Sequence, residues 1–488
     1  MTEQAPLFRL VVPAPPKPSS SSSWLGKIFL AGISAAALLG ATYHVHEQAT
    51  VAPPVAAHVT GSRTTATTLN GSSFCDATYQ EAGYVQLPHK VDDHYFYWFF
   101  ESRSNPATDP LVLWLTGGPG SSSMIALLTE NGPCSISDNL TTIHNPHSWT
   151  SHANVIWLDQ PTGVGFSYTT SDKDDDHNQV DVGRNIYAFL QEFLAKHPKY
   201  AKSPFFITGE SYGGHYVPAA AHYILNAQLE PRASRRSKIH INLRGISVGN
   251  GLTDPATQIP LTPALAVTNA YNISLVPADQ LTQLLQDAVH AGVLAQECRD
   301  GQRQSCLAAL GLWDDAVIGV MQQMNRNPYD IREFCGESCF DETANAARFL
   351  NLATTQATLG VHKPWVMTNE TTYSDFSADF MQDYVSYVLD LLAHGVRVLI
   401  YAGDADIMCN WVGNEAWTKD LVWPGQAAFN NATVHPLLVD GASYGEVRSI
   451  SSLSFVRVYE AGHMVPTNQP KASLALIERF FKAQPLDQ

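Results

Sequence analysis

Charged residues are scarce in this chain of 488 residues, and basic ones are the scarcer kind. Asp, Glu, Lys and Arg make up 15% of the sequence, and 29 basic against 45 acidic residues leave a formal net charge of −16. Nucleic-acid-binding proteins need clustered positive charge, so this composition argues against nucleic acid as a partner. The hydrophobic content of 45% excludes a disordered chain and predicts a substantial core.

Cysteine is also sparse, and its spacing matches no zinc module. The seven cysteines include no close pair that is repeated by a matching Cys or His pair nearby, so we predict no metal site. Five N-x-Ser/Thr sequons are present, at Asn70, Asn139, Asn272, Asn369 and Asn431. Sequons and a disulfide framework both indicate the secretory pathway.

One apolar run falls just short of the roughly 20 residues that a membrane-spanning helix prefers. Residues 28–43 are predominantly apolar; three basic residues precede them, whereas only Glu47 follows closely. This asymmetry predicts a cytosolic N-terminus and a translocated remainder. We interpret residues 24–43 as an uncleaved signal anchor, and a signal peptide cleaved after Ala37 or Ala41 is the rival interpretation.

The rest of the chain divides by composition and periodicity. Residues 1–23 are expected to form a disordered cytosolic tail and residues 44–73 a flexible stalk. Residues 74–251 and 366–488 alternate short apolar segments with amphipathic ones, which indicates a mostly parallel sheet with helices on both faces. Residues 252–365 break this rhythm and hold four of the seven cysteines, so we predict a helical, disulfide-bearing insertion that forms a lid.

Within the two core parts, apolar runs predict strands and a period of 3.6 residues predicts helices. The expected strands are a hairpin within 84–101 and runs at 111–115, 155–158, 205–207, 241–248, 396–401 and 454–458. The expected helices are 180–196, 376–394 and a final one near 471–482, with a further helical piece at 277–294 in the insertion.

The strongest local motif is Gly209-Glu210-Ser211-Tyr212-Gly213, which directly follows an expected strand. It fits G-x-S-x-G, a sharp strand-to-helix turn that presents a serine hydroxyl above a sheet. Glycines flank the serine because such a turn leaves no room for neighbouring Cβ atoms. By itself the motif fits a plain glycine-rich connection equally well, so the interpretation depends on partners elsewhere in the chain.

A serine nucleophile needs a histidine base and an orienting carboxylate, which α/β-hydrolases supply in the chain order Ser, Asp, His. Asp406 follows the expected strand 396–401, and His463 follows the strand 454–458. Both lie beyond strand ends, where parallel sheets bind ligands. We therefore predict Ser211, Asp406 and His463 as a catalytic triad. Asp404 is the competing carboxylate, and its other possible role is to fix the turn.

The glycine-rich segment 116–120 follows the expected strand 111–115, where an α/β-hydrolase places its second oxyanion donor. We predict that the backbone N–H groups of Gly118 and Tyr212 bind the developing oxyanion. A plain Gly-Pro turn is the alternative interpretation.

Together these motifs resemble the serine carboxypeptidase family, and the likeness runs from about Cys75 to the C-terminus. It is carried, in order, by residues 113–122, 130–133, 159–168, 209–213, 249–255, 401–411 and 462–466. The resemblance implies an α/β-hydrolase fold, the triad and oxyanion donors named above, and no metal or organic cofactor. It also implies a set that grips the substrate's terminal carboxylate, supported by Trp114, and a pocket for the departing residue: Thr116, Gly117, Glu130 and Glu210 in the set, and Met464 in the pocket.

Two carboxyl groups in one pocket bind a carboxylate only if they hold protons, because like charges cannot all ionise there. We therefore expect an acidic optimum for peptide substrates. Thr116 departs from the family pattern, which has asparagine at this position, and a shorter donor weakens the expected grip.

Cysteine usage also departs from the family. Ser121 replaces a frequent cysteine, and no partner cysteine occurs within 362–375, so we expect that disulfide to be absent. Cys409 matches a free thiol near the triad. The other six are then expected to pair as Cys75–Cys134, Cys298–Cys306 and Cys335–Cys339, a connectivity that sequence does not fix.

The sequence thus predicts a serine carboxypeptidase that releases the C-terminal residue of peptides and proteins through an acyl-enzyme. Its expected location is the secretory pathway, in a vacuolar or lysosomal lumen or outside the cell, bound to the membrane if the N-terminal segment stays uncleaved. The alternatives are an acyltransferase on the same scaffold and a protective binding role that does not depend on catalysis. Neither the preferred C-terminal residue nor the oligomeric state follows from the sequence.

Overall fold

The computed structural model describes residues 64–69, 74–231, 238–335, 339 and 343–487. The predicted cytosolic tail, the predicted anchor at 24–43 and most of the predicted stalk lie outside these residues, so those assignments stay predictions. Part of the predicted stalk is not flexible, because Thr64–Thr68 form strand β1, which pairs with β2 Gln80–Gln86. Among the residues that are described, no helix combines the length and apolar character needed to cross a bilayer.

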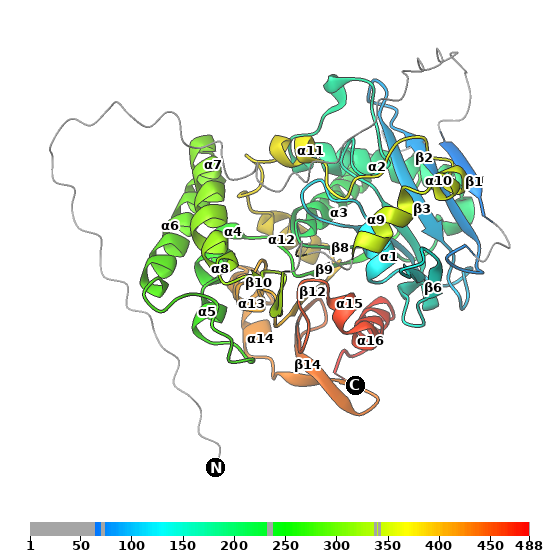
Figure 1. The fold of residues 1–488 in the computed structure, drawn as a ribbon. Coiled ribbons are helices and arrows are strands. Elements are labelled where there is room, and N and C mark those ends of the chain that lie inside the picture. Colours follow the sequence, from blue (N-terminus) through cyan, green and yellow to red (C-terminus); the bar gives the residue numbers. More distant parts are fainter. Residues whose placement is uncertain (1–63, 70–73, 232–237, 336–338, 340–342, 488) are drawn as a thin grey trace, which may run out of the picture. The chain divides into compact units, whose positions relative to one another are not determined.

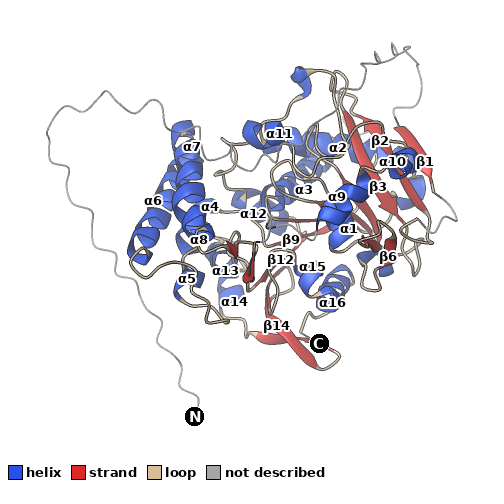
Figure 2. Ribbon diagram, viewed as in Figure 1, coloured by secondary structure: helices blue, strands red, loops and turns tan. Residues whose placement is uncertain are grey.

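An 11-stranded sheet forms the core, in the order β1-β2-β3-β7-β4-β8-β9-β12-β15-β14-β13 (Figure 2). The six central strands, from β7 to β15, are mutually parallel, and antiparallel strands flank them at both edges. The bounds are β1 Thr64–Thr68, β2 Gln80–Gln86, β3 His94–Phe100, β4 Leu111–Leu115, β7 Asn154–Leu158, β8 Phe205–Glu210, β9 Leu243–Gly249, β12 Arg397–Gly403, β13 His435–Val439, β14 Ala442–Ser449 and β15 Leu453–Val458.

The sheet separates two hydrophobic cores, because successive side chains of a strand point to opposite faces. In β3, Tyr95, Tyr97 and Phe99 enter one core, whereas Phe96, Trp98 and Phe100 enter the other. The first core is covered by α2 Gln179–Lys196, α3 Gly213–Leu229 and α12 Val385–Ala393, and the second by α1 Met124–Thr129 and α16 Pro470–Phe481. Every residue of β4 and β7 is therefore buried, as expected for parallel strands covered on both sides.

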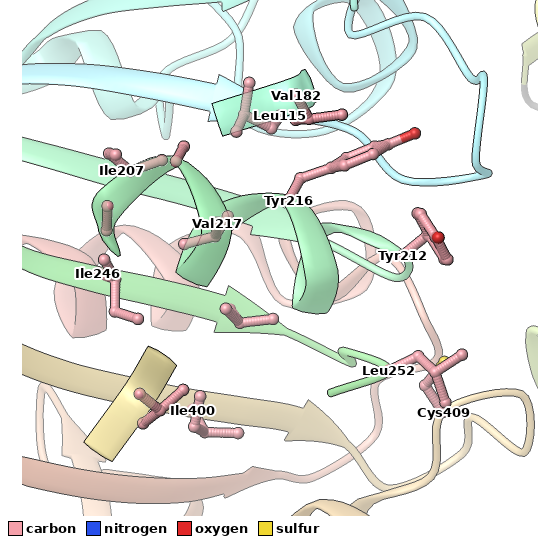
Figure 3. Packing of buried hydrophobic residues seen from close by; sticks show 14 of the residues in the cluster. Leu115, Val182, Ile207, Tyr212, Tyr216, Val217, Ile246, Leu252, Ile400 and Cys409 are labelled. Carbon is pink, nitrogen blue, oxygen red and sulfur yellow. The ribbon is translucent and has the colours of Figure 1, made fainter. Parts of the chain in front are cut away.

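Figure 3 shows the first core beneath the nucleophile turn. Ile207, Ile246 and Ile400 come from the neighbouring strands β8, β9 and β12, and they pack with Tyr216 and Val217 of α3. Burying aliphatic side chains of this size contributes about 1.5–3 kcal/mol each to stability. This core therefore supports the first turn of α3 and the end of β8 from below.

Between β9 and β12 the chain adds no strand to the large sheet within its described residues (Figure 1). It forms instead a two-stranded hairpin and several helices, of which α6 and α7 lie side by side. The bounds are α4 Pro255–Gln258, α5 Ala264–Val267, α6 Leu281–Arg299, α7 Arg303–Leu312, the π-helical turn η5 Trp313–Ile318, α8 Gly319–Gln322, β10 Arg326–Asn327, β11 Asp330–Phe334, α9 Ala344–Leu350, α10 Ala353–Leu359 and α11 Glu370–Asp375. The exact limits predicted for the insertion stay a prediction.

Short elements complete the fold, and the cysteine connectivity is as expected. The remaining elements are β5 Cys134–Ile136, β6 Thr142–His144, α13 Trp411–Asp420, α14 Gln426–Asn430 and α15 Val465–Asn468. Disulfides join Cys75 to Cys134, Cys298 to Cys306 and Cys335 to Cys339, and Cys409 is free and buried.

One predicted helix is wrong over half its length. Helix α12 begins at Val385, whereas residues 376–384, predicted as its N-terminal half, form turns. The Asp379 carboxylate accepts hydrogen bonds from the hydroxyls of Tyr212 and Tyr384, each at 2.6 Å. These tertiary bonds hold the segment above the nucleophile turn and outweigh its helical periodicity.

Candidate active site

Ser211 lies in a strained turn between β8 and α3. Its φ of 63° is in the left-handed region, which non-glycine residues rarely adopt. The turn is fixed by backbone hydrogen bonds, since Ser211 N donates to Gly249 O at 3.1 Å and Ser211 O accepts from Leu252 N at 3.0 Å. A Cβ on Gly209 would lie 2.5 Å from Leu115 O, which confirms the steric need for glycine there. The turn therefore presents Ser211 in one fixed orientation.

Asp406 and His463 meet because they follow the neighbouring strands β12 and β15. Asp406 is fully buried, and its Oδ2 lies 2.8 Å from His463 Nδ1. The carboxylate also accepts hydrogen bonds from Asn250 Nδ2 at 2.8 Å and from the N–H groups of Met408 and Cys409 at 2.9 and 3.2 Å. These donors fix the position of the Asp406 carboxyl group, and its Oδ2 as an acceptor favours the imidazole tautomer with the proton on Nδ1.

His463 Nε2 carries no hydrogen bond to any described residue, and His463 lines the same cavity as Ser211. A neutral imidazole with its proton on Nδ1 has a free lone pair on Nε2. The arrangement therefore leaves Nε2 available to take the hydroxyl proton of Ser211.

Asp404, the competing carboxylate, makes structural contacts, whereas Asp406 contacts His463. Asp404 Oδ1 accepts hydrogen bonds from the Tyr271 hydroxyl and, at 3.0 Å, from Glu460 N. Its Oδ2 accepts from Arg457 Nη2 at 3.2 Å. Asp404 thus fixes the turn after β12 and ties it to the insertion.

The glycine-rich loop after β4 lies against the nucleophile turn. A Cβ on Gly117 would lie 2.4 Å from Tyr212 N and 2.9 Å from Ser211 Cβ, so only glycine allows this approach. Gly118 has a φ of 111°, which also requires glycine. Gly118 and Tyr212 both line a cavity beside Ser211, where two backbone N–H groups from facing turns can bind one oxyanion.

Two glutamates form a buried carboxyl pair beside the nucleophile. Glu210 ends β8 and Glu130 follows α1, and both side chains are buried. Burial, then the charge of Glu130 and a hydrogen bond to it, raises the pKa of Glu210 well above its ordinary value. Two like charges buried this close oppose each other's ionisation, which favours a proton on the pair.

Thr116 is prepared to donate into the same cavity. Trp114 Nε1 donates to Thr116 Oγ1 at 2.9 Å, so the hydroxyl already accepts one hydrogen bond and keeps its own proton for another partner. The cavity has a volume of about 490 Å³ and is lined, among others, by the predicted carboxylate-binding residues and the residue of the departing-residue pocket, Thr116, Gly117, Glu130, Glu210 and Met464. The structure thus brings together all the residues that the sequence assigned to this set.

Ser121 makes a hydrogen bond where the family frequently has a disulfide. Its hydroxyl lies 2.8 Å from Thr368 Oγ1, and the two residues form an isolated antiparallel bridge. Thr368 belongs to the segment 362–375 in which the family's partner cysteine was sought, so the two segments are adjacent here without a disulfide.

Sequence reasoning missed two residues that support the site. Asn250 holds Asp406 and accepts a hydrogen bond from Gly403 N at 3.0 Å, and its φ of 41° explains why Asn occupies the turn. A polar residue between two glycines at the end of a central strand was the available signal. Asp379 was missed because its segment was predicted as a helix.

Comparison with known proteins agrees with this geometry. Residues 72–483 match the family described as Serine carboxypeptidase. A serine carboxypeptidase-like protein of Oryza sativa subsp. japonica is 39% identical over 85% of this chain and 95% of the relative. Carboxypeptidase Y of Komagataella phaffii is 40% identical over 83% of this chain and 76% of the relative. A prohormone-processing carboxypeptidase from Saccharomyces cerevisiae, of known structure, superimposes with a TM-score of 0.71 at 24% identity, over 83% of this chain and 91% of that one.

Proposed function

This chain belongs to the serine carboxypeptidase family, and we propose that it releases the C-terminal residue of peptides with Ser211 as nucleophile and with a preference for acidic pH. The observation that carries the proposal is the buried carboxyl pair of Glu130 and Glu210 in the same cavity as Ser211 and His463. A proton-sharing pair donates to a carboxylate and repels it little, whereas an amide or ester end gains nothing from it.

In the proposed acylation step, the Ser211 Oγ–H proton passes to His463 Nε2 as Oγ attacks the last peptide carbonyl. The N–H groups of Gly118 and Tyr212 donate to the resulting oxyanion, and Asp406 stays ionised beside the imidazolium. The C–N bond then breaks, and the imidazolium gives its proton to the leaving amine. A serine ester of the shortened peptide remains.

In the proposed deacylation step, His463 takes a proton from water, whose oxygen attacks the ester carbonyl. Collapse of the second tetrahedral intermediate releases the shortened peptide, and the imidazolium returns its proton to Ser211 Oγ. Before the C–N bond breaks, the departing residue is held by its carboxylate, through the glutamate pair, the Thr116 hydroxyl and Gly117 N–H. Met464 lies beside its side chain.

The proposal is tested with a matched pair of blocked dipeptides, one ending in a free carboxylate and one in an amide. The full chain and its Ser211→Ala variant are assayed at pH 5 and pH 7.5. We expect hydrolysis of the free acid, best at pH 5 and lost in the variant, because only the free acid engages the carboxyl pair. Equal cleavage of the amide would contradict the proposal and favour esterase, amidase or acyl-transfer chemistry.

We also propose that the protein works in the secretory pathway. Three disulfides support this location, because they form and persist in oxidising compartments. The predicted membrane attachment through residues 24–43 is part of the proposal. Protease protection of the C-terminal part in sealed microsomes would test it.

A further inference from the structure

The active site has a second, smaller cavity of about 160 Å³ on the other side of Ser211. It shares Gly118, Ser211, Tyr329 and Tyr373 with the larger cavity, so the nucleophile lies between the two. The larger cavity holds the glutamate pair, where the proposed function places the departing residue. The residue immediately before the scissile bond must then direct its side chain into the smaller cavity.

The smaller cavity is lined by both apolar and polar residues and contains one charged side chain. Trp313 and Ile318 line it together with Leu252 and Phe380, and Asp314 adds a carboxyl group. Residues 313–318 form the π-helical turn η5 at the end of α7. Such turns are rare and often occur at functional sites, because the wider turn changes the direction of its side chains. Apolar walls with one carboxyl group fit a side chain with an apolar stem and a cationic end.

The electrostatic surroundings of Asp314 lack a compensating cation. Burial and then the charge of Asp315 raise the pKa of Asp314. The other titratable groups that respond to its charge are Tyr329, which precedes β11, and Tyr373 of α11; the charge contributes to raising the pKa of both. No Lys or Arg lines the cavity among the described residues, and His463 lines the larger cavity only. Asp314 is itself exposed where it lines the cavity, so a substrate cation can reach its carboxyl group.

We propose that Asp314 selects peptides with Lys or Arg immediately before the C-terminal residue. The methylene stem packs against Trp313 and Phe380, whose rings contact each other at a centroid distance of 5.7 Å, and the cation pairs with the Asp314 carboxylate. This inference rests on the proposed function, because it uses the same nucleophile and substrate direction. It adds the class of substrate that the acyl side accepts.

The test uses blocked dipeptides that end in leucine and carry Arg, Leu or Glu before it, assayed with the full chain at pH 6.5. We expect kcat/KM to be highest for the Arg substrate. In Asp314→Asn the Arg substrate loses up to about fivefold, as for a solvent-exposed ion pair, and the Leu substrate loses much less. Asp315→Asn is the matched control, because Asp315 is adjacent in sequence but lines neither cavity. It keeps the preference for Arg.

Charge reversal gives a second, independent measurement. Asp314→Lys should make the Glu substrate better than the Arg substrate, because the sign of the charge in the cavity is inverted. Equal losses on the Arg and Leu substrates in Asp314→Asn, or no gain for Glu in Asp314→Lys, would overturn the inference. Wild-type hydrolysis of the Leu substrate without a preference for Arg would also overturn it, yet leave the proposed function intact. Failure to hydrolyse any of the three would overturn both.

Discussion

Thr116 sets how firmly the substrate's terminal carboxylate is held. Asparagine at this position keeps the contact with Trp114, through Oδ1, and extends a longer N–H donor into the cavity. For Thr116→Asn we expect KM for free-acid substrates to fall about fivefold, the value of one net hydrogen bond, with kcat little changed. Thr116→Val should raise KM, because valine has no donor.

The amidated substrate is the control for both Thr116 variants, since it has no carboxylate to bind. Kinetic constants on the acid and amide forms of one dipeptide are sufficient. An equal change on both forms would show that Thr116 acts on the position of the loop and not on the carboxylate.

Glu210 links substrate binding to pH. The carboxyl pair binds a carboxylate while it holds its proton, so KM should rise as pH rises through the raised pKa of Glu210. Glu210→Gln has the same shape and donates at every pH. We expect KM of the wild type to rise about tenfold per pH unit above that pKa, and KM of the variant to change much less between pH 5 and 7.5.

Glu415→Gln is a control of the same chemistry, because Glu415 pairs with Arg448 outside the cavity. It should follow the wild-type profile of KM against pH. Identical profiles for Glu210→Gln and the wild type would mean that another group titrates.

At the scale of elements, the bridge between Ser121 and Thr368 joins the glycine-rich loop to the segment before α11. Directly opposed residues of antiparallel strands have Cα atoms about 4.5–5.5 Å apart, within the range that a disulfide requires. We expect Ser121→Cys/Thr368→Cys to form a disulfide and to stabilise the fold by about 2–4 kcal/mol. Thiol counting and thermal unfolding measure both effects.

The single variant Ser121→Cys is the control for that pair, and it should gain no stability. Two free thiols in the double variant would show that the two segments do not pair in solution as the hydrogen bond indicates.

The elements of the core follow from local patterns, because their periodicity and their burial agree. The run at 111–115 became β4 with identical limits, and the predicted helix 180–196 became α2 Gln179–Lys196. The helix prediction for residues 376–384 was wrong because the hydrogen bonds of Asp379 with Tyr212 and Tyr384 depend on tertiary contacts, which local periodicity does not report. Strand β14, which lies next to the edge strand β13, was not predicted, since its exposed face gives it few apolar residues.

At the scale of the whole folded part, buried carboxyl groups with raised pKa values should make the protein more stable at low pH than at neutral pH. Thr162 Oγ1 lies 2.5 Å from Asp93 Oδ2 and 2.9 Å from Asp176 Oδ2. One hydroxyl proton cannot serve both, which favours a proton on Asp93. Burial raises the pKa of Asp93 to about 8, and burial likewise raises the pKa of Asp159 to about 6.

The sign follows from the difference between the folded and unfolded pKa values. An unfolded Asp ionises near 3.8, so the stabilisation is complete below that pH and is lost as pH rises through about 8. Between these values Asp93 alone lowers the free energy of unfolding by at most about 1.4 kcal/mol per pH unit. We expect Tm to fall from pH 5 to pH 8, and to fall less in Asp93→Asn, whose amide still donates to Thr162.

Glu81 has the opposite sign and serves as the control. Hydrogen bonds from His197 and Tyr97 outweigh burial and lower its pKa to about 2, so its stabilisation is present above pH 4.5 and lost below it. Glu81→Gln should change the acid limb of the Tm curve and leave the fall above pH 5 unchanged. A Tm that is constant from pH 5 to 8 in the wild type would contradict the role of Asp93.

The chemistry of this protein and its proposed selectivity lie on different parts of the chain. Ser211, Asp406 and His463 follow strands of the sheet, whereas Trp313 and Asp314 belong to the excursion between β9 and β12. Mutations in that excursion can therefore accumulate or be exchanged between relatives while the reaction itself is conserved. A lineage that keeps the sheet and varies residues 313–318 would acquire new substrate preferences with the same catalytic residues. Grafting that turn between relatives offers a route to the same result in the laboratory.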